Sequence, residues 1–249
     1  MQKTLISIIG STGIGKTKLA IEMAKHFGTE IISCDSRQFF KEMKIGTATP
    51  TDEELAQAKH HFIGHLSVQD YYSIGQYEED ALEKIEEIFE KNDFAVLVGG
   101  SMMYEKAVVE GLNDLPEANA ENQEKLQKIL DEEGLEKLQE ILKNLDEEYY
   151  NVVHKENPRR LLRAIDVIWQ TGRKYSEIIA EPKHKRDFKV MRIGVTAPRE
   201  IMYERINLRV DKMLENGLID EVKSLTEYQK LVPLQTVGYS EIFKYLEGT

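Results

Sequence analysis

The sequence predicts an α/β fold in which a doubly wound parallel sheet is interrupted by an all-helical insertion. Short apolar segments with strand character alternate with amphipathic helices, and this alternation is typical of parallel strands covered by helices on both faces. The expected strands lie near 4–10, 30–33, 94–98 and 190–195. The expected helices lie near 15–27, 52–59, 74–91 and 198–216.

One long stretch departs from this alternation. Residues 117–185 contain consecutive amphipathic helical patterns and no strand, so we expect them to form a helical insertion domain. The core domain is then discontinuous and consists of residues 1–116 and 186–249. A chain of 249 residues, 41% of them hydrophobic, has enough apolar material for both parts.

The first expected strand runs into a glycine-rich loop with the pattern Gly-x₄-Gly-Lys-Thr. A strand before such a loop and a helix after it are the context of a phosphate-binding P-loop, which makes the predicted sheet P-loop NTPase-like. The backbone N–H groups, the helix N-terminus and Lys16 would bind phosphate oxygens, and the Thr17 hydroxyl is placed to ligate Mg²⁺. The residues assigned to a phosphate or pyrophosphate are Gly10, Ser11, Thr12, Gly13, Ile14, Gly15, Lys16 and Thr17.

An acidic residue is expected opposite this loop. The apolar segment 94–98 is followed by Gly99-Gly100-Ser101 and no acid, whereas Asp35 follows the segment 30–33. Ligands of doubly wound sheets bind at the carboxyl ends of the strands, so Asp35 should face the P-loop across a crevice. A helix-capping or turn role for Asp35 is an equally open alternative.

Several further motifs follow in order along the chain. They span Ile32 to Gln38, Lys44 to Pro50, His60 to Ile63, Leu97 to Ser101, Gly111 to Pro116, Asn157 to Ala164, and Val237 to Tyr239. Together they resemble the bacterial tRNA dimethylallyltransferase family over essentially the whole chain. Membership implies transfer of a dimethylallyl group from dimethylallyl diphosphate to N6 of the adenosine 3′-adjacent to the anticodon, with release of pyrophosphate. It also implies tRNA, bound through its anticodon stem-loop, as a partner and Mg²⁺ as a cofactor.

The resemblance implies roles for individual residues. Asp35 would be the base that accepts a proton from the exocyclic amine, while Lys16, Thr17 and Mg²⁺ would neutralise charge on the leaving diphosphate. The implied tRNA contacts on the core domain are Asp35, Ser36, Arg37, Gln38 and Ser101. Family members carry Thr-Gly-Leu-Tyr where this chain has Ser-Met-Met-Tyr, so the shape of the prenyl and base channel is in question.

A helix is expected to begin at Asn157 and Pro158 and to end at Gly172. Its buried side would be formed by Leu161, Leu162, Ile165, Ile168 and Trp169. Its arginines share another side, where they could pair with carboxylates of the same chain. The resemblance implies instead that this helix contacts tRNA through Arg159, Arg160, Leu161, Leu162 and Arg163.

The helix near 198–216 carries Arg205 and Arg209 at i and i+4. The resemblance implies that Arg209 contacts the diphosphate as a catalytic residue and that Arg205 supports it. Ion pairs with the neighbouring Glu204 or Asp211 are the alternative.

The charge of −11 is unusual for a tRNA-binding protein, but it is unevenly distributed. Residues 117–148 hold eleven acids and four lysines, whereas residues 155–192 hold eleven Lys and Arg and five acids, which can place a basic face toward RNA. A single cysteine, Cys34, and the absence of a leader or a bilayer-long apolar stretch predict a cytoplasmic protein without membrane association. We expect a monomer. The adjacent His60 and His61 are expected to be structural or to border the substrate.

Family members continue beyond the Val237–Tyr239 motif in a basic, aromatic helical tail, whereas this chain ends at Thr249. The sequence looks shortened, so we expect ordinary diphosphate binding and weaker tRNA binding. Two other function classes use the same features. One is a small-molecule kinase that binds ATP in the P-loop and an acceptor hydroxyl at Asp35, and the other is a non-catalytic RNA-binding module.

Overall fold

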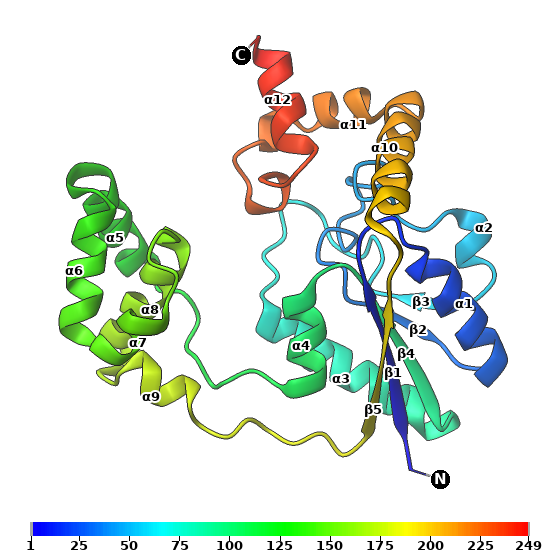
Figure 1. Ribbon diagram of the computed structural model, residues 1–249, viewed down its shortest axis with the longest axis horizontal. Coiled ribbons are helices and arrows are strands. Elements are labelled where there is room, and N and C mark those ends of the chain that lie inside the picture. The colour runs from blue at the N-terminus through cyan, green and yellow to red at the C-terminus, as the bar shows by residue number, and fades with distance from the viewer. Residues whose placement is uncertain (1, 249) are drawn as a thin grey trace. The chain divides into compact units, whose positions relative to one another are not determined.

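The computed structural model describes residues 2–248. A five-stranded sheet lies at its centre in the order β3-β2-β4-β1-β5, and every pair of neighbouring strands is parallel (Figure 1). This arrangement confirms the predicted α/β class. The strands are β1 (Thr4–Gly10), β2 (Ile31–Ser33), β3 (His60–His61), β4 (Phe94–Val98) and β5 (Lys189–Val195).

Twelve α-helices and two short 3₁₀ helices are assigned in residues 2–248. The first four helices are α1 (Lys16–Phe27), α2 (Asp52–Leu55), α3 (Ile74–Lys91) and α4 (Met102–Glu110). The next five are α5 (Ala120–Glu133), α6 (Leu135–Leu145), α7 (Glu147–Val152), α8 (Pro158–Thr171) and α9 (Tyr175–Ile179). The last segments are α10 (Arg199–Glu215), α11 (Leu218–Ser224), the 3₁₀ helices Thr226–Tyr228 and Val232–Leu234, and α12 (Tyr239–Glu247).

Helices cover both faces of the sheet. Successive side chains of a strand point to opposite faces, so neighbouring residues of one strand pack against different helices. Leu5 of β1 packs in a cluster that includes Ile85 of α3. The next residue, Ile6, packs in a separate cluster with Ala20 of α1. The strands β1, β2 and β4 are thereby buried on both sides, and their carboxyl ends meet at one edge of the sheet.

The observed boundaries differ from the expected ones where the pattern is short or weak. The helix α2 ends at Leu55 instead of near residue 59, and the strand β3 was not expected, since two residues are too few for a strand pattern. The strand β5 lies at the edge of the sheet, and Met191 in it remains 46% exposed. The helix α10 has no buried side chain.

The chain divides into two compact units, the first formed by residues 2–111 and 185–248 and the second by residues 112–184. The expected boundaries lay five residues later at the first junction and one residue later at the second. The second unit is helical, and Leu126, Leu138 and Leu142 lie at its centre. No described helix is long and apolar enough to cross a membrane.

The helix α8 begins and ends in the second unit as its sequence predicts. The Asn157 side chain accepts a hydrogen bond from the Arg160 N–H, Pro158 is the first helical residue, and Gly172 at φ 69° closes the helix. Trp169 was expected on the buried side but is 39% exposed. Val167, which was not expected to be buried, is fully buried.

Candidate active site

The loop between β1 and α1 has the geometry of an anion-binding nest. Gly13 and Gly15 have φ values of 76° and 100°, in the left-handed region that glycine adopts without strain. No side chain caps the start of α1, so the N–H groups of its first turn are left for a ligand. The Lys16 ammonium bends back over the loop and donates to the carbonyl oxygens of Gly10 and Ser11, each at 3.0 Å.

Lys16 is a partly buried cation beside this loop. Burial lowers its pKa, the negative charge of Asp35 opposes that shift, and the positive charge of Arg209 adds to it. Burial likewise lowers the pKa of Arg209, and Asp35 again acts in the opposite direction. Asp35, Lys16 and Arg209 therefore lie within electrostatic reach of one another, although they come from three separate segments of the chain.

Asp35 makes a turn and also presents a carboxylate oxygen. Its Oδ1 accepts a hydrogen bond from the Arg37 N–H at 3.2 Å, which is the turn role that the sequence left open. Its Oδ2 has no hydrogen-bond partner within residues 2–248 and would lie 2.9 Å from a Cβ placed on Gly100. The two roles use different oxygens, so they do not exclude each other.

The ends of β2 and β4 approach so closely that a side chain does not fit between them. A Cβ on Gly99 would lie 2.5 Å from the carbonyl carbon of Cys34 and 2.6 Å from the Asp35 nitrogen. Next to this contact, the Ser36 and Ser101 hydroxyl oxygens are 2.9 Å apart, and the Ser101 hydroxyl accepts from the Ser36 N–H at 3.0 Å. The structure thus brings the predicted site residues Asp35, Ser36 and Ser101 together at one edge of the sheet.

Cys34 lies at this contact and is almost completely buried. Burial raises the pKa of its thiol, so the side chain stays neutral and packs as an apolar group.

The two arginines of α10 point to the loops of the site. Arg205 Nη1 donates to the Ile14 carbonyl of the P-loop at 3.4 Å, and Arg209 Nη2 donates to the Thr47 carbonyl at 3.2 Å. In the part of the chain that the structure describes, neither arginine forms an ion pair with Glu204 or Asp211. The alternative of local ion pairs along the helix is therefore not observed.

Gln38 and Arg37 are occupied within the first unit. The Gln38 amide donates to the carbonyl oxygens of Thr47 and Ala48, each at 3.2 Å, and Arg37 Nη1 donates to the Val232 carbonyl at 3.3 Å. Gln38 thus supports the loop that receives Arg209. Because the amide nitrogen of Gln38 is used in this way, only the amide oxygen of its side chain is left for an external hydrogen bond.

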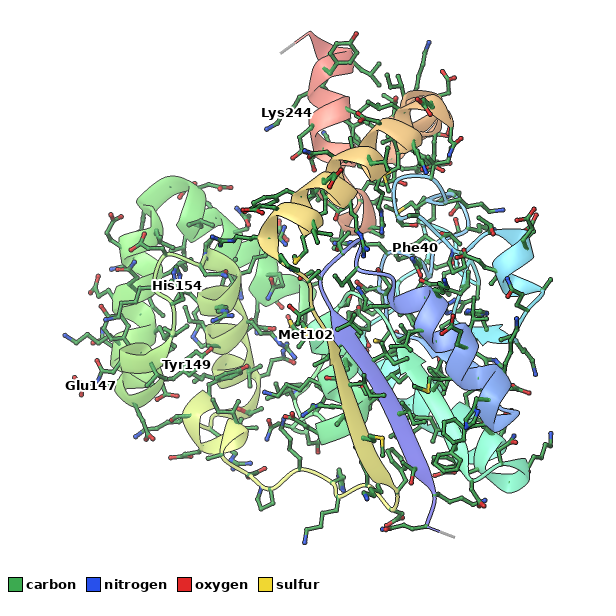
Figure 2. All side chains as sticks on the ribbon, turned by 45° about the vertical axis from the view of Figure 1, so that its right-hand side comes forward. Phe40, Met102, Glu147, Tyr149, His154 and Lys244 are labelled. Atoms are coloured by element: carbon green, nitrogen blue, oxygen red, sulfur yellow. The ribbon has the colours of Figure 1, made fainter. Side chains whose placement is uncertain are left out.

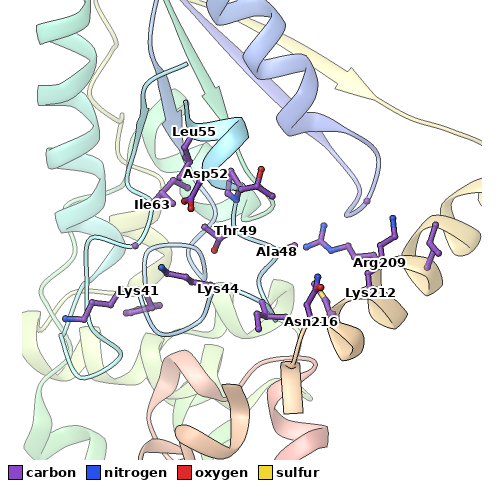
Figure 3. A pocket seen from close by; sticks show the side chains of 18 of the residues that line it. Lys41, Lys44, Ala48, Thr49, Asp52, Leu55, Ile63, Arg209, Lys212 and Asn216 are labelled. Carbon is purple, nitrogen blue, oxygen red and sulfur yellow. The ribbon is translucent and has the colours of Figure 1, made fainter. Parts of the chain in front are cut away.

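A cavity of about 850 Å³ opens between α10 and the segment 40–64 (Figure 3). Its cationic lining residues are Lys41, Lys44, Arg205, Arg209 and Lys212, and its acidic lining residue is Asp52. We call Lys41, Lys44 and Lys212 the outer lysines; none has an ion-pair partner among the described residues. None of the three was predicted as a site residue, although Lys212 follows Arg209 and Arg205 at i+3 and i+7 on one helix.

One free oxygen donor for a divalent metal lies next to the P-loop. Thr17 lies in the first turn of α1, and its hydroxyl has no hydrogen-bond partner within residues 2–248. An uncharged hydroxyl and nearby oxygen ligands suit Mg²⁺. The described residues contain no cluster of three His, Cys, Asp or Glu side chains able to hold a metal alone.

The adjacent histidines take part in local structure. His61 Nε2 lies 2.6 Å from a Glu30 carboxylate oxygen, and His60 Nδ1 lies 2.8 Å from the Ala58 carbonyl oxygen. These contacts fit the expected structural role.

The helix α8 presents only part of its predicted tRNA-contacting group. Leu161 and Leu162 are buried in the core of the second unit, so their side chains are not presented at its surface, in contrast to their expected contact with tRNA. Arg163 pairs with the fully buried Asp166 at 3.3 Å and also donates to the Pro116 carbonyl. The start of the helix remains exposed at Arg159 and Arg160.

The start of α4 is where this chain departs from the expected Thr-Gly-Leu-Tyr pattern. Met102, labelled in Figure 2, is 60% exposed, and Met103 is 71% exposed. Two large flexible apolar side chains therefore border Ser101.

Comparison with known proteins gives consistent results. A sequence model described as IPP transferase matches residues 38–249. The chain is 50% identical to the tRNA dimethylallyltransferase of Christiangramia forsetii, and the alignment covers 100% of this chain and 82% of that protein. It is 45% identical to tRNA dimethylallyltransferase 1 of Bacteroides thetaiotaomicron over 98% of this chain and 80% of the relative.

Two solved structures extend the comparison. The tRNA isopentenylpyrophosphate transferase of Bacillus halodurans is 33% identical, with a TM-score of 0.68, over 100% of this chain and 78% of that one. A eukaryotic dimethylallyltransferase acting on tRNA is 25% identical, with a TM-score of 0.79, over 99% of this chain and 66% of that one. The matches extend across the P-loop, which lies outside the residues matched by the sequence model.

Proposed function

This chain belongs to the IPP transferase family, and we propose that it transfers a dimethylallyl group from dimethylallyl diphosphate to N6 of the adenosine 3′-adjacent to the anticodon of tRNA. The observation that supports this proposal best is that Lys16 of the P-loop, the Asp35 carboxylate and Arg209 lie within electrostatic reach of one another. A diphosphate leaving group and an amine nucleophile need these two kinds of charge on opposite sides of the reacting carbon.

The P-loop would bind the diphosphate of the donor. The N–H groups of the first turn of α1 and the Lys16 ammonium would replace water around the phosphate oxygens, and Arg205 and Arg209 would approach from α10. As the bond between carbon and oxygen breaks, negative charge grows on the diphosphate, and these fixed cations stabilise it. When bound beside Thr17, Mg²⁺ would add positive charge at the same oxygens.

Asp35 would act on the nucleophile. A bond forms between N6 and the first carbon of the prenyl group while the bond from that carbon to the diphosphate breaks. N6 then carries an excess proton, which passes to the free Oδ2 of Asp35, and pyrophosphate leaves. The turn formed by Oδ1 holds the carboxylate in one orientation during this transfer.

The tRNA would be contacted at two places. Ser36 and Ser101 border the carboxylate in the first unit, and Arg159 and Arg160 lie exposed on the second. Arginine side chains such as Arg159 and Arg160 bind the phosphate backbone of a nucleic acid without reading its base sequence. We further propose a cytoplasmic monomer, for which the buried Cys34 is a compatible feature.

The test is transfer of labelled dimethylallyl to an anticodon stem-loop with adenosine after the anticodon. A matched stem-loop with guanosine at that position is the control, because it has no N6 amine. Incorporation into the first RNA alone supports the proposal. No incorporation, together with transfer of the terminal phosphate of ATP to an acceptor hydroxyl, would refute it in favour of a kinase.

A further inference from the structure

The loop 45–48 fixes the position of Arg209. The Thr47 carbonyl accepts one hydrogen bond from Arg209 and another from Gln38, and the Ala48 carbonyl accepts a third from Gln38. Ala48 has a φ of 45°, a left-handed conformation that is unfavourable for a residue with a side chain. Such a loop keeps its shape only when the surrounding structure holds it.

Glu221 of α11 holds this loop. Its two carboxylate oxygens accept from successive backbone N–H groups, Ile45 at 2.8 Å and Gly46 at 3.0 Å. The oxygen that accepts from Gly46 also accepts from the Tyr239 hydroxyl at 2.6 Å. Hydrogen bonds to an ionised acceptor are stronger than neutral ones, so this carboxylate is a firm anchor.

Tyr239 of α12 completes the anchor. Its side chain is fully buried, and burial together with the hydrogen bond to Glu221 raises the pKa of its hydroxyl, which therefore remains a donor. A Cβ on Gly46 would lie 2.5 Å from the Tyr239 ring. The loop can reach Glu221 only because residue 46 is glycine.

We propose that Glu221 and Tyr239 are positioning residues that act through the loop 45–48 to aim Arg209 at the donor's diphosphate. A guanidinium has five N–H donors, and the structure uses one of Arg209's on the Thr47 carbonyl. The direction of the other donors thus depends on where that carbonyl lies. The identity of the anion as the donor's diphosphate rests on the proposed function. The positioning of Arg209 by Glu221 and Tyr239 does not depend on it.

The experiment measures transfer kinetics and the affinity for inorganic pyrophosphate in the full chain. Glu221→Gln keeps the size of the side chain but replaces one acceptor oxygen by a donor, and Tyr239→Phe removes only the hydroxyl. Each should lower pyrophosphate affinity and kcat/KM for the donor by on the order of 10- to 100-fold, as expected when a contact group shifts by about an ångström. The KM for tRNA should not change. Tyr245→Phe, on an exposed tyrosine of the same helix, is the control and should have no effect.

Repeating both changes in an Arg209→Ala background separates positioning from general support of the fold. If Glu221 and Tyr239 act through Arg209, they should have no further effect once Arg209 is removed. Equal losses with and without Arg209, or wild-type pyrophosphate affinity in both single variants, would overturn the inference. A parent protein that binds pyrophosphate but transfers no prenyl group would overturn the proposed function alone.

Discussion

The substitution Asp35→Asn separates the roles of the two oxygens of this side chain. The carbonyl oxygen of the asparagine can still accept from the Arg37 N–H, so the turn survives and the melting temperature should stay close to that of the parent. The free Oδ2 becomes an amide nitrogen, which cannot accept the N6 proton. A positioned base contributes about 10²- to 10⁴-fold, so we expect kcat for transfer to fall by that factor. This corresponds to about 3–5 kcal/mol of activation free energy.

The donor should bind at least as well to this variant. Removing a negative charge near Lys16 and Arg209 takes away repulsion toward the diphosphate, although it also removes the influence that raises the pKa of both cations. Single-turnover transfer to a stem-loop and calorimetric titration with pyrophosphate measure the two effects separately. A kcat within a few-fold of the parent would show that Asp35 is only a turn residue.

Two further changes test other parts of the site, and two more test the second unit. Lys16→Ala should weaken pyrophosphate binding and remove its decline at alkaline pH, which in the parent follows from loss of the ammonium proton at a pKa below that of an ordinary lysine. Replacing the outer lysines by glutamine should reduce kcat/KM for the donor and flatten its salt dependence, leaving kcat unchanged, because exposed charges steer association; an unchanged salt slope would contradict this role. Neutralising Arg159 and Arg160 should reduce the salt slope of tRNA binding by up to about two units. Arg163→Ala should instead destabilise the second unit by about 1–3 kcal/mol in a urea titration, since Asp166 loses a partner.

The features that followed from the sequence are those with a local cause. The P-loop has its own pattern of glycines, the cap and stop of α8 lie within a few residues of its ends, and β4 is a continuous apolar run. The position of Asp35 followed from a general property of parallel sheets. Each of these depends on the near neighbours of a residue or on one rule of topology.

The parts that could not be predicted depend on contacts between distant segments. Nothing in the neighbourhood of Glu221 indicates that it accepts from the N–H groups of Ile45 and Gly46, 176 and 175 residues away. Two features of α8, by contrast, have a local cause: the helical pattern itself places Leu161 and Leu162 on the buried side. Arg163 pairs with a buried aspartate that lies three residues away, a spacing that the sequence already contained.

The absence of a buried side chain in α10 has an energetic consequence. Segments that bury little apolar surface open at a small fraction of the global free energy of unfolding. Two of the side-chain cations expected to hold the diphosphate, Arg205 and Arg209, therefore reside on an element that we expect to open at a lower free-energy cost than α1. Because an anion held by both arginines favours the closed state, pyrophosphate should protect the amides of α10 from hydrogen exchange more than those of α1, which is anchored in the core by Ala20, Ile21 and Ala24.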